Sequence, residues 1–348
     1  MRKSLSSTTD KNPAFVKMIA ETSANHHFEE IDREVSSLVK ERIDEKLFSV
    51  LDGLFRVEQP LDMDMMYINL WAEEIVMEEH LVLDIMFLLY FDPSCFCSFS
   101  RWKELYALFK DRVFVGTNVE RLSLTTEAGS LIEHVKHQCV LIILEGLELD
   151  KLLLMVYEDA PFSQGRHPFA CSDLLQQIYR LIGGVNALEV KEYAPLLLGL
   201  GAFCCLVSFL PMADSGILDS NHTYYIHQAY EAGAFKYIKN MLCHRGMKET
   251  LVDGYKYVVR SMMSTFVAAY DISSQSDTTV VEDVIDILSL IYSGQETLCT
   301  EFWDRENILD APLRNLLCSL RKYFPYKMKT LVHFLTGLAG GQWAAECV

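Results

Sequence analysis

The chain has 348 residues and a formal net charge of −17, with 31 Lys and Arg against 48 Asp and Glu. This balance argues against direct nucleic-acid binding, because phosphate contacts require clustered basic side chains. Hydrophobic residues make up 50% of the chain, which excludes general disorder and suffices for a sizeable core.

Apolar residues recur with the three- and four-residue spacing of α-helices, and short polar loops separate the runs. Alternating β-branched stretches, which would indicate strands, are almost absent. Residues 1–27 form a mixed segment that we expect to be frayed. In chain order, we predict helices over Phe28–Leu54, Asp62–Tyr90, Ser100–Lys110, from Thr125 or Thr126 through Ile142 towards Tyr157, Asp173–Ile182, Tyr193–Leu210, Thr223–Leu242, Lys248–Tyr270, Val280–Tyr292, Pro312–Lys322 and Pro325–Leu338.

Several of these helices are apolar nearly all round, so other helices or lipid must cover them. Such helices in series predict an all-α fold, an irregular α-solenoid of stacked helical hairpins like HEAT or armadillo repeats, with no β-sheet. We expect one solenoid segment over residues 28–348, truncated at its C-terminus. The loop 158–170 holds two prolines and a glycine and is the candidate internal break.

The run Tyr193–Ala213 contains no charged residue and is long enough to span a bilayer. Prolines lie near both of its ends, and it lacks the asymmetric basic flank that orients a membrane helix. We therefore expect a buried helix of the solenoid and no transmembrane span, with a membrane anchor as the alternative.

Motifs that carry catalysis are absent: the chain has no phosphate-binding loop, no GxSxG elbow and no HExxH zinc motif. We expect no enzyme, no cofactor and no metal site; a hydrolase is the least favoured alternative. His134 and His137 lie one helical turn apart, but too few ligands accompany them for a metal, so a solvent-facing pair is expected. The cysteines are expected to be free thiols, mostly packed in apolar runs, among them Cys139, Cys204, Cys205 and Cys318.

Acidic residues are concentrated between Val57 and Ser100, where the chain has no Lys or Arg. A solvated helix face is the simplest explanation of such a run, and a docking surface for a basic partner is the functional one. The candidate docking residues are Glu73, Glu74, Glu78 and Glu79.

Four groups of segments follow one another along the chain: EEHLVLDIMFLLYF from Glu78 with RWKELYALFK from Arg101, CVLIILEGLELDKL from Cys139, YAPLLLGLGAFCCL from Tyr193, and EFWDRENILDAPLRNLL from Glu301 with YFPYKMKTLVHFLTGLAGG from Tyr323. In this order they resemble the N-terminal region of the nucleoporin-188 family, large scaffold proteins of the nuclear pore inner ring, in a plant-like form. The Glu145-Gly146 step is the most telling piece, and the resemblance covers most of residues 30–345.

The resemblance implies a structural component of the nuclear pore complex at the nuclear envelope. It would contribute to pore assembly and to nucleocytoplasmic transport of protein and mRNA through contacts with other inner-ring and linker nucleoporins. Family members are several times longer, and their main linker-binding site lies in a distal C-terminal solenoid that we expect to be missing here. The alternative is a HEAT- or armadillo-like adaptor or a binding protein of the transport-receptor type.

Overall fold

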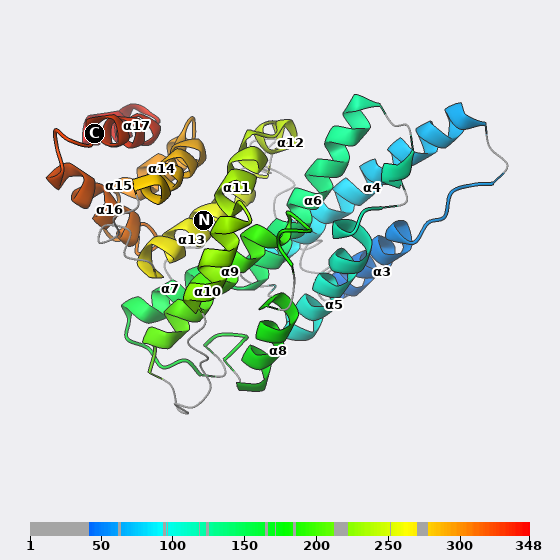
Figure 1. The fold of residues 1–348 in the computed structure, drawn as a ribbon, viewed down its shortest axis with the longest axis horizontal. Coiled ribbons are helices and arrows are strands. Elements are labelled where there is room, and N and C mark those ends of the chain that lie inside the picture. The colour runs from blue at the N-terminus through cyan, green and yellow to red at the C-terminus, as the bar shows by residue number, and fades with distance from the viewer. Residues whose placement is uncertain are drawn as a thin grey trace, which may run out of the picture. The chain divides into compact units, whose positions relative to one another are not determined.

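The computed structural model describes residues 42–61, 64–92, 95, 97–117, 119–122, 125–163, 166–170, 172–183, 186–211, 222–250, 252–269 and 278–348. Helices pack against one another in a solenoid-like manner, and no strand occurs in these ranges (Figure 1). The predicted all-α class is therefore confirmed. The chain divides into two compact units, Met1–Ile142 and Ile143–Val348, and the loop 158–170 lies within the second. The predicted segment 1–27 and the start of the first predicted helix lie outside the described residues.

The first unit is built around the long helix α4, which packs against α3. One face of α4 is buried, with apolar residues such as Val76, Leu83 and Phe87 at helical spacing. Trp102 and Phe109 of α5 are fully buried as well. The described elements of this unit are α3 (Ile43–Phe55), α4 (Met65–Phe91), α5 (Phe99–Phe109), the π-helical turn η1 (Lys110–Phe114), the 3-10 turn η2 (Val119–Arg121) and most of α6 (Thr126–Gly146).

Thr125 caps the start of α6, as one of the two predicted capping residues: its Oγ1 accepts a hydrogen bond from the amide of Ala128 at 3.2 Å. The helix does not continue to Tyr157, so that part of the prediction is wrong. It ends at Gly146, and Glu148 adopts a left-handed conformation with φ of 50°. This residue turns the chain into a separate helix, α7.

The second unit contains α7 (Leu149–Tyr157), α8 (Ser172–Gly183), α9 (Tyr193–Phe209), α10 (His222–Glu231), α11 (Ala234–Cys243), α12 (Arg245–Glu249), α13 (Gly254–Ala269), α14 (Thr278–Tyr292), α15 (Glu296–Trp303), α16 (Ala311–Lys322), α17 (Met328–Leu338) and α18 (Gln342–Cys347). Helix α9 is central to this unit, since it contacts α7, α8, α10, α11 and α13. Every residue from Tyr193 to Val207 is buried. A Cβ on Gly199 would lie 2.6 Å from Leu144 Cδ2, so any larger residue would displace this leucine side chain.

The apolar run at α9 is thus the buried helix that the sequence predicts. No helix in the described part of the chain is long and apolar enough to cross a membrane. Other predicted helices are shorter than expected. Gly233, with φ of 80°, separates α10 from α11, and the helix predicted from Pro325 begins only at Met328. The short helices α15 and α18 were not predicted, because each is too brief to show a repeating apolar pattern.

The loop 158–170 packs into the second unit through a buried histidine. The His167 ring lies 5.5–5.7 Å from the rings of Phe162, Phe169 and Phe203, measured between centroids. Its Nδ1 accepts a hydrogen bond from the Phe169 amide at 3.2 Å, and burial lowers the pKa of His167 to about 4. A neutral imidazole therefore fixes the end of this loop.

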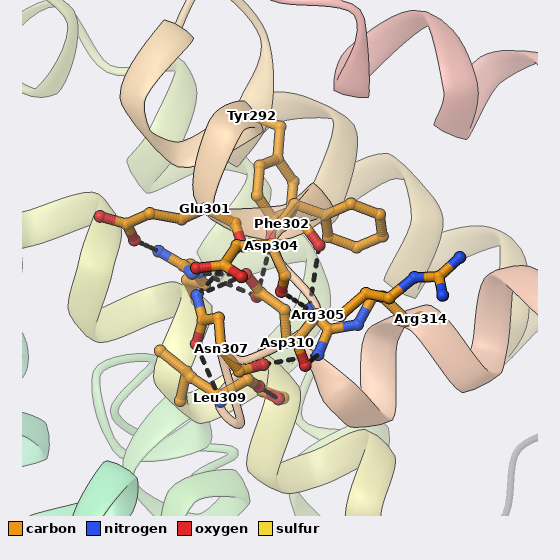
Figure 2. Close-up of polar contacts among 11 residues, drawn as sticks. Tyr292, Glu301, Phe302, Asp304, Arg305, Asn307, Leu309, Asp310 and Arg314 are labelled. Atoms are coloured by element: carbon orange, nitrogen blue, oxygen red, sulfur yellow. Dashed lines mark hydrogen bonds and ion pairs between the residues drawn. The ribbon is translucent and has the colours of Figure 1, made fainter. Parts of the chain in front are cut away.

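A buried ionic cluster links α13, α14, α15 and the turn before α16 (Figure 2). The side chain of Arg260 is fully buried; its Nε donates to Asp310 at 2.9 Å and its Nη1 to Glu301 at 2.6 Å. The Tyr292 hydroxyl donates to Asp310 at 2.7 Å. Burial by itself lowers the pKa of Arg260, but the Asp310 charge outweighs it and holds this pKa well above its ordinary value.

The turn between α15 and α16 is fixed by the same network. Arg314 donates to the backbone carbonyls of Phe302 and Asp304, both at 2.9 Å, and Asn307 donates to Asp310. These bonds satisfy carbonyl groups that no helix pairs. We assign the cluster a structural role, because its central pair, Arg260 and Asp310, is fully buried.

Candidate partner-docking surface

Helix α4 exposes apolar side chains on the face opposite its buried one. Five of them are 48–62% exposed: Met66, Leu70, Met77, Leu81 and Ile85. Their spacings of four and seven residues place them along one side of the helix. A helix that is apolar all round is normally covered on every side, and within the described part of the chain this face of α4 stays exposed. We call these residues, together with Glu74 and Glu78, the α4 stripe.

Of the four predicted docking acids, only Glu74 and Glu78 belong to the exposed stripe. Glu74 follows Leu70 by one helical turn and Glu78 precedes Leu81 by less than one, so the two carboxylates are interleaved with the apolar residues. Helix α4 carries no Lys or Arg, so the stripe presents apolar and negative groups alone.

The other two predicted acids face the protein. Glu73 accepts a hydrogen bond from the hydroxyl of Thr125 at 2.7 Å and so joins α4 to the start of α6. Glu79 is only 3% exposed and lies in the core. Burial, and then the charge of Glu120, raise the pKa of Glu79 to about 8. Glu79 is therefore not part of the stripe and is mostly uncharged at neutral pH.

A hydrogen-bonded group fixes the edge of α4 against α6. Gln138 donates through Nε2 to Asp84 at 2.6 Å and to the carbonyl of His80 at 3.2 Å. Its Oε1 lies 3.1 Å from Nδ1 of His80. Because these bonds come from two different turns of α4, the helix is held in one orientation and the stripe keeps facing outward.

Two further predictions about side chains are wrong. His134 and His137 are 2% and 5% exposed rather than solvent-facing, and the His134 ring lies 5.0 Å from that of His80. Cys318 is exposed, whereas Cys139 and Cys204 are buried as expected. In each case the residue lies on a predicted helix, but the side of that helix that the protein covers was not predicted correctly.

The apolar residues of the stripe differ from the sequence-based expectation that every apolar helix is covered. The signal was present in the printed sequence: Met66, Leu70, Met77 and Leu81 already form a second apolar row on the predicted helix. A helix with apolar rows on two opposite faces needs two partners.

Comparison with models of known protein families and with curated proteins finds no match to this chain. The nucleoporin resemblance therefore rests on the order of the sequence segments.

Proposed function

We propose that this chain is a structural scaffold component of the nuclear pore inner ring that acts through protein–protein contacts. The observation that carries a scaffold role is the α4 stripe, an apolar and acidic surface held on a rigid helix. Contiguous exposed apolar surface of this kind typically marks a protein interaction site. The assignment to the nuclear pore is supported by sequence segments between Glu78 and the end of α17. They follow one another along the chain in the same order as in the nucleoporin-188 family.

The proposed mechanism is geometric. Packed helices fix the stripe, and a helix of a partner lies along it with apolar residues at every third or fourth position and with Lys or Arg at the edges. Burial of the apolar side chains supplies most of the binding free energy, while the pairs with Glu74 and Glu78 set orientation and association rate.

Localisation tests the pore assignment directly. A fluorescent fusion of the full-length gene product is expected at the nuclear rim, and the variant with Glu74→Lys and Glu78→Lys is expected to lose part of that rim signal. Glu231→Lys with Glu306→Lys is the matched control, because both residues are exposed and the net charge changes equally. Diffuse fluorescence of the unsubstituted protein would contradict the proposal.

The second candidate is a HEAT- or armadillo-like adaptor. The fold alone favours it, since stacked helices of this kind serve many binding proteins. It predicts diffuse fluorescence together with the same sensitivity of partner binding to Glu74→Lys and Glu78→Lys, which separates it from the pore scaffold.

A further inference from the structure

The C-terminal part of the chain carries a surface whose charge is opposite to that of the α4 stripe. No Asp or Glu occurs from Ala311 to Ala345, in a protein with a net charge of −17. Four cationic residues are close in sequence, at the end of α16, in the following turn and at the start of α17: Arg321, Lys322, Lys327 and Lys329.

The same turn exposes large apolar and aromatic side chains. Tyr326 is 93% exposed, and four others are about half exposed: Tyr323, Phe324, Met328 and Val332. Met328 and Val332 are one helical turn apart, so they share the outer side of α17. We call these five residues and the four cations the α17 patch.

The cations of the α17 patch are directed to its surface. Arg321, Lys322 and Lys329 are exposed, and Lys327 lies with its Nζ 5.2 Å from the centroid of the Tyr323 ring. At the border of the patch, His333 of α17 lies 3.3 Å from Asp286 of α14. The patch therefore presents aromatic side chains, which are enriched at protein-binding surfaces, beside positive groups that can orient an acidic partner.

The α4 stripe and the α17 patch complement each other in charge and resemble each other in apolar content. We propose that the α17 patch of one molecule docks on the α4 stripe of a second copy of this chain. The inference rests on the proposed role of the α4 stripe as a docking surface, and it names one partner of that surface.

Such an interface is heterologous, because it joins two different surfaces. A pair of molecules keeps one unused stripe, on one molecule, and one unused patch, on the other, so assembly continues into a ring or an open row of molecules. Contacts between exposed charges are screened by salt, with a Debye length of about 8 Å at physiological ionic strength. We therefore expect weak assembly that depends on protein concentration and on salt.

The test uses the full chain and measures its mass by light scattering and sedimentation. The mass is expected to rise above the monomer value of 39.8 kDa as concentration increases, and to return to it in high salt. Two charge-reversed variants, Glu74→Lys with Glu78→Lys and Lys322→Glu with Lys329→Glu, are each expected to remain monomeric. The control with Glu231→Lys and Glu306→Lys is expected to assemble like the original protein.

Mixing the two variants provides the decisive result. The acidic patch of one variant then fits the basic stripe of the other, and the remaining patch and stripe are unchanged, so an equal mixture is expected to assemble again. All four residues are exposed, and unchanged circular dichroism melting curves verify folding. A mass of 39.8 kDa at every concentration, or no recovery on mixing, overturns the inference.

The outcomes also separate this inference from the proposed function. A protein that stays monomeric but loses its rim signal on Glu74→Lys and Glu78→Lys retains the docking function and refutes self-assembly. A protein that assembles in vitro and is diffuse in the cell supports self-assembly and refutes the pore role.

Discussion

At the scale of single residues, Glu79 has the clearest pH dependence. Its pKa is about 8 in the folded protein, against an ordinary value of 4.5. Between these values the unfolded chain has released the proton and the folded protein still holds it. The unfolded state therefore binds fewer protons, and the contribution of Glu79 to stability is lost as the pH rises from about 4.5 to about 8.

We predict that Glu79→Gln, which keeps this position neutral, makes the protein more stable than the original at pH 8, by roughly 2–4 kcal/mol from the size of the pKa shift. At pH 4.5 the two proteins should differ little. Urea denaturation at both pH values checks this, and Glu78→Gln, on the exposed side of the same turn, is the control without an effect. A loss of stability in Glu79→Gln at pH 8 would contradict the prediction.

The position of Glu79 could not be deduced from the sequence. An amphipathic helix reveals its buried side through its polar residues, but α4 has apolar residues on both faces and acids on both as well. Thr125 was predictable, because an N-cap depends on local bonds to the next few residues. The burial of Glu79 results from tertiary packing, and Glu120 of η2, whose charge acts on it, is far away in the sequence.

At the scale of elements, the cluster around Arg260 joins α13, α14 and α15 to the turn before α16. Asp310 is 0% exposed and pairs with an Arg260 side chain that is also fully buried, whereas the Glu301 side chain is 16% exposed. Removing a charge whose partner is buried leaves an uncompensated ion in the core.

We predict that Asp310→Asn lowers the free energy of unfolding by about 3–5 kcal/mol. Glu301→Gln should cost clearly less, because solvent reaches that carboxylate and Arg260 retains Asp310. Urea denaturation of both variants measures the difference. Equal losses would show that the two acids share the Arg260 charge evenly, contrary to the geometry.

Close helix packing gives a second prediction at this scale. Gly199→Ala places a methyl group 2.6 Å from Leu144 Cδ2 in a fully buried helix, and we expect a loss of about 1–3 kcal/mol. Gly53→Ala is the matched control, since its added Cβ meets nothing within 4 Å and lies in α3. At Gly53 the substitution should raise the free energy of unfolding by up to about 1 kcal/mol, because alanine has a higher helix propensity than glycine. Thermal melting of both variants checks the opposite signs.

The helices themselves were largely predictable, and their ends were less so. Long periodic runs such as those at α4, α9 and α14 gave boundaries close to those observed. The division of one predicted helix into α6 and α7 depends on the left-handed residue Glu148, and glutamate carries no local preference for that conformation. Gly233 does carry such a preference, because glycine readily adopts positive φ, but the sequence-based prediction placed no helix end there.

For the whole molecule, the main question is what covers the α4 stripe. The sequence predicted an acidic docking surface on this helix, of which Glu74 and Glu78 are exposed, but not the apolar residues beside them. Periodicity identifies apolar rows and not which of them faces solvent. The stripe and the α17 patch both became evident only when exposure was known.

The last prediction therefore tests the open surface by itself. Met77→Gln with Leu81→Gln removes two apolar side chains, 48% and 51% exposed, from the middle of the stripe. Since they make few contacts within the protein, the melting temperature should stay within about 2 °C, in line with the small effects of surface substitutions. Binding of an apolar fluorescent dye and the concentration-dependent rise in mass should both decrease.

Leu83→Gln, at a fully buried position of the same helix, is the contrasting variant and should lose several kcal/mol of stability. If Met77→Gln with Leu81→Gln destabilised the isolated protein as much as Leu83→Gln does, the stripe would be a covered surface and not a docking site.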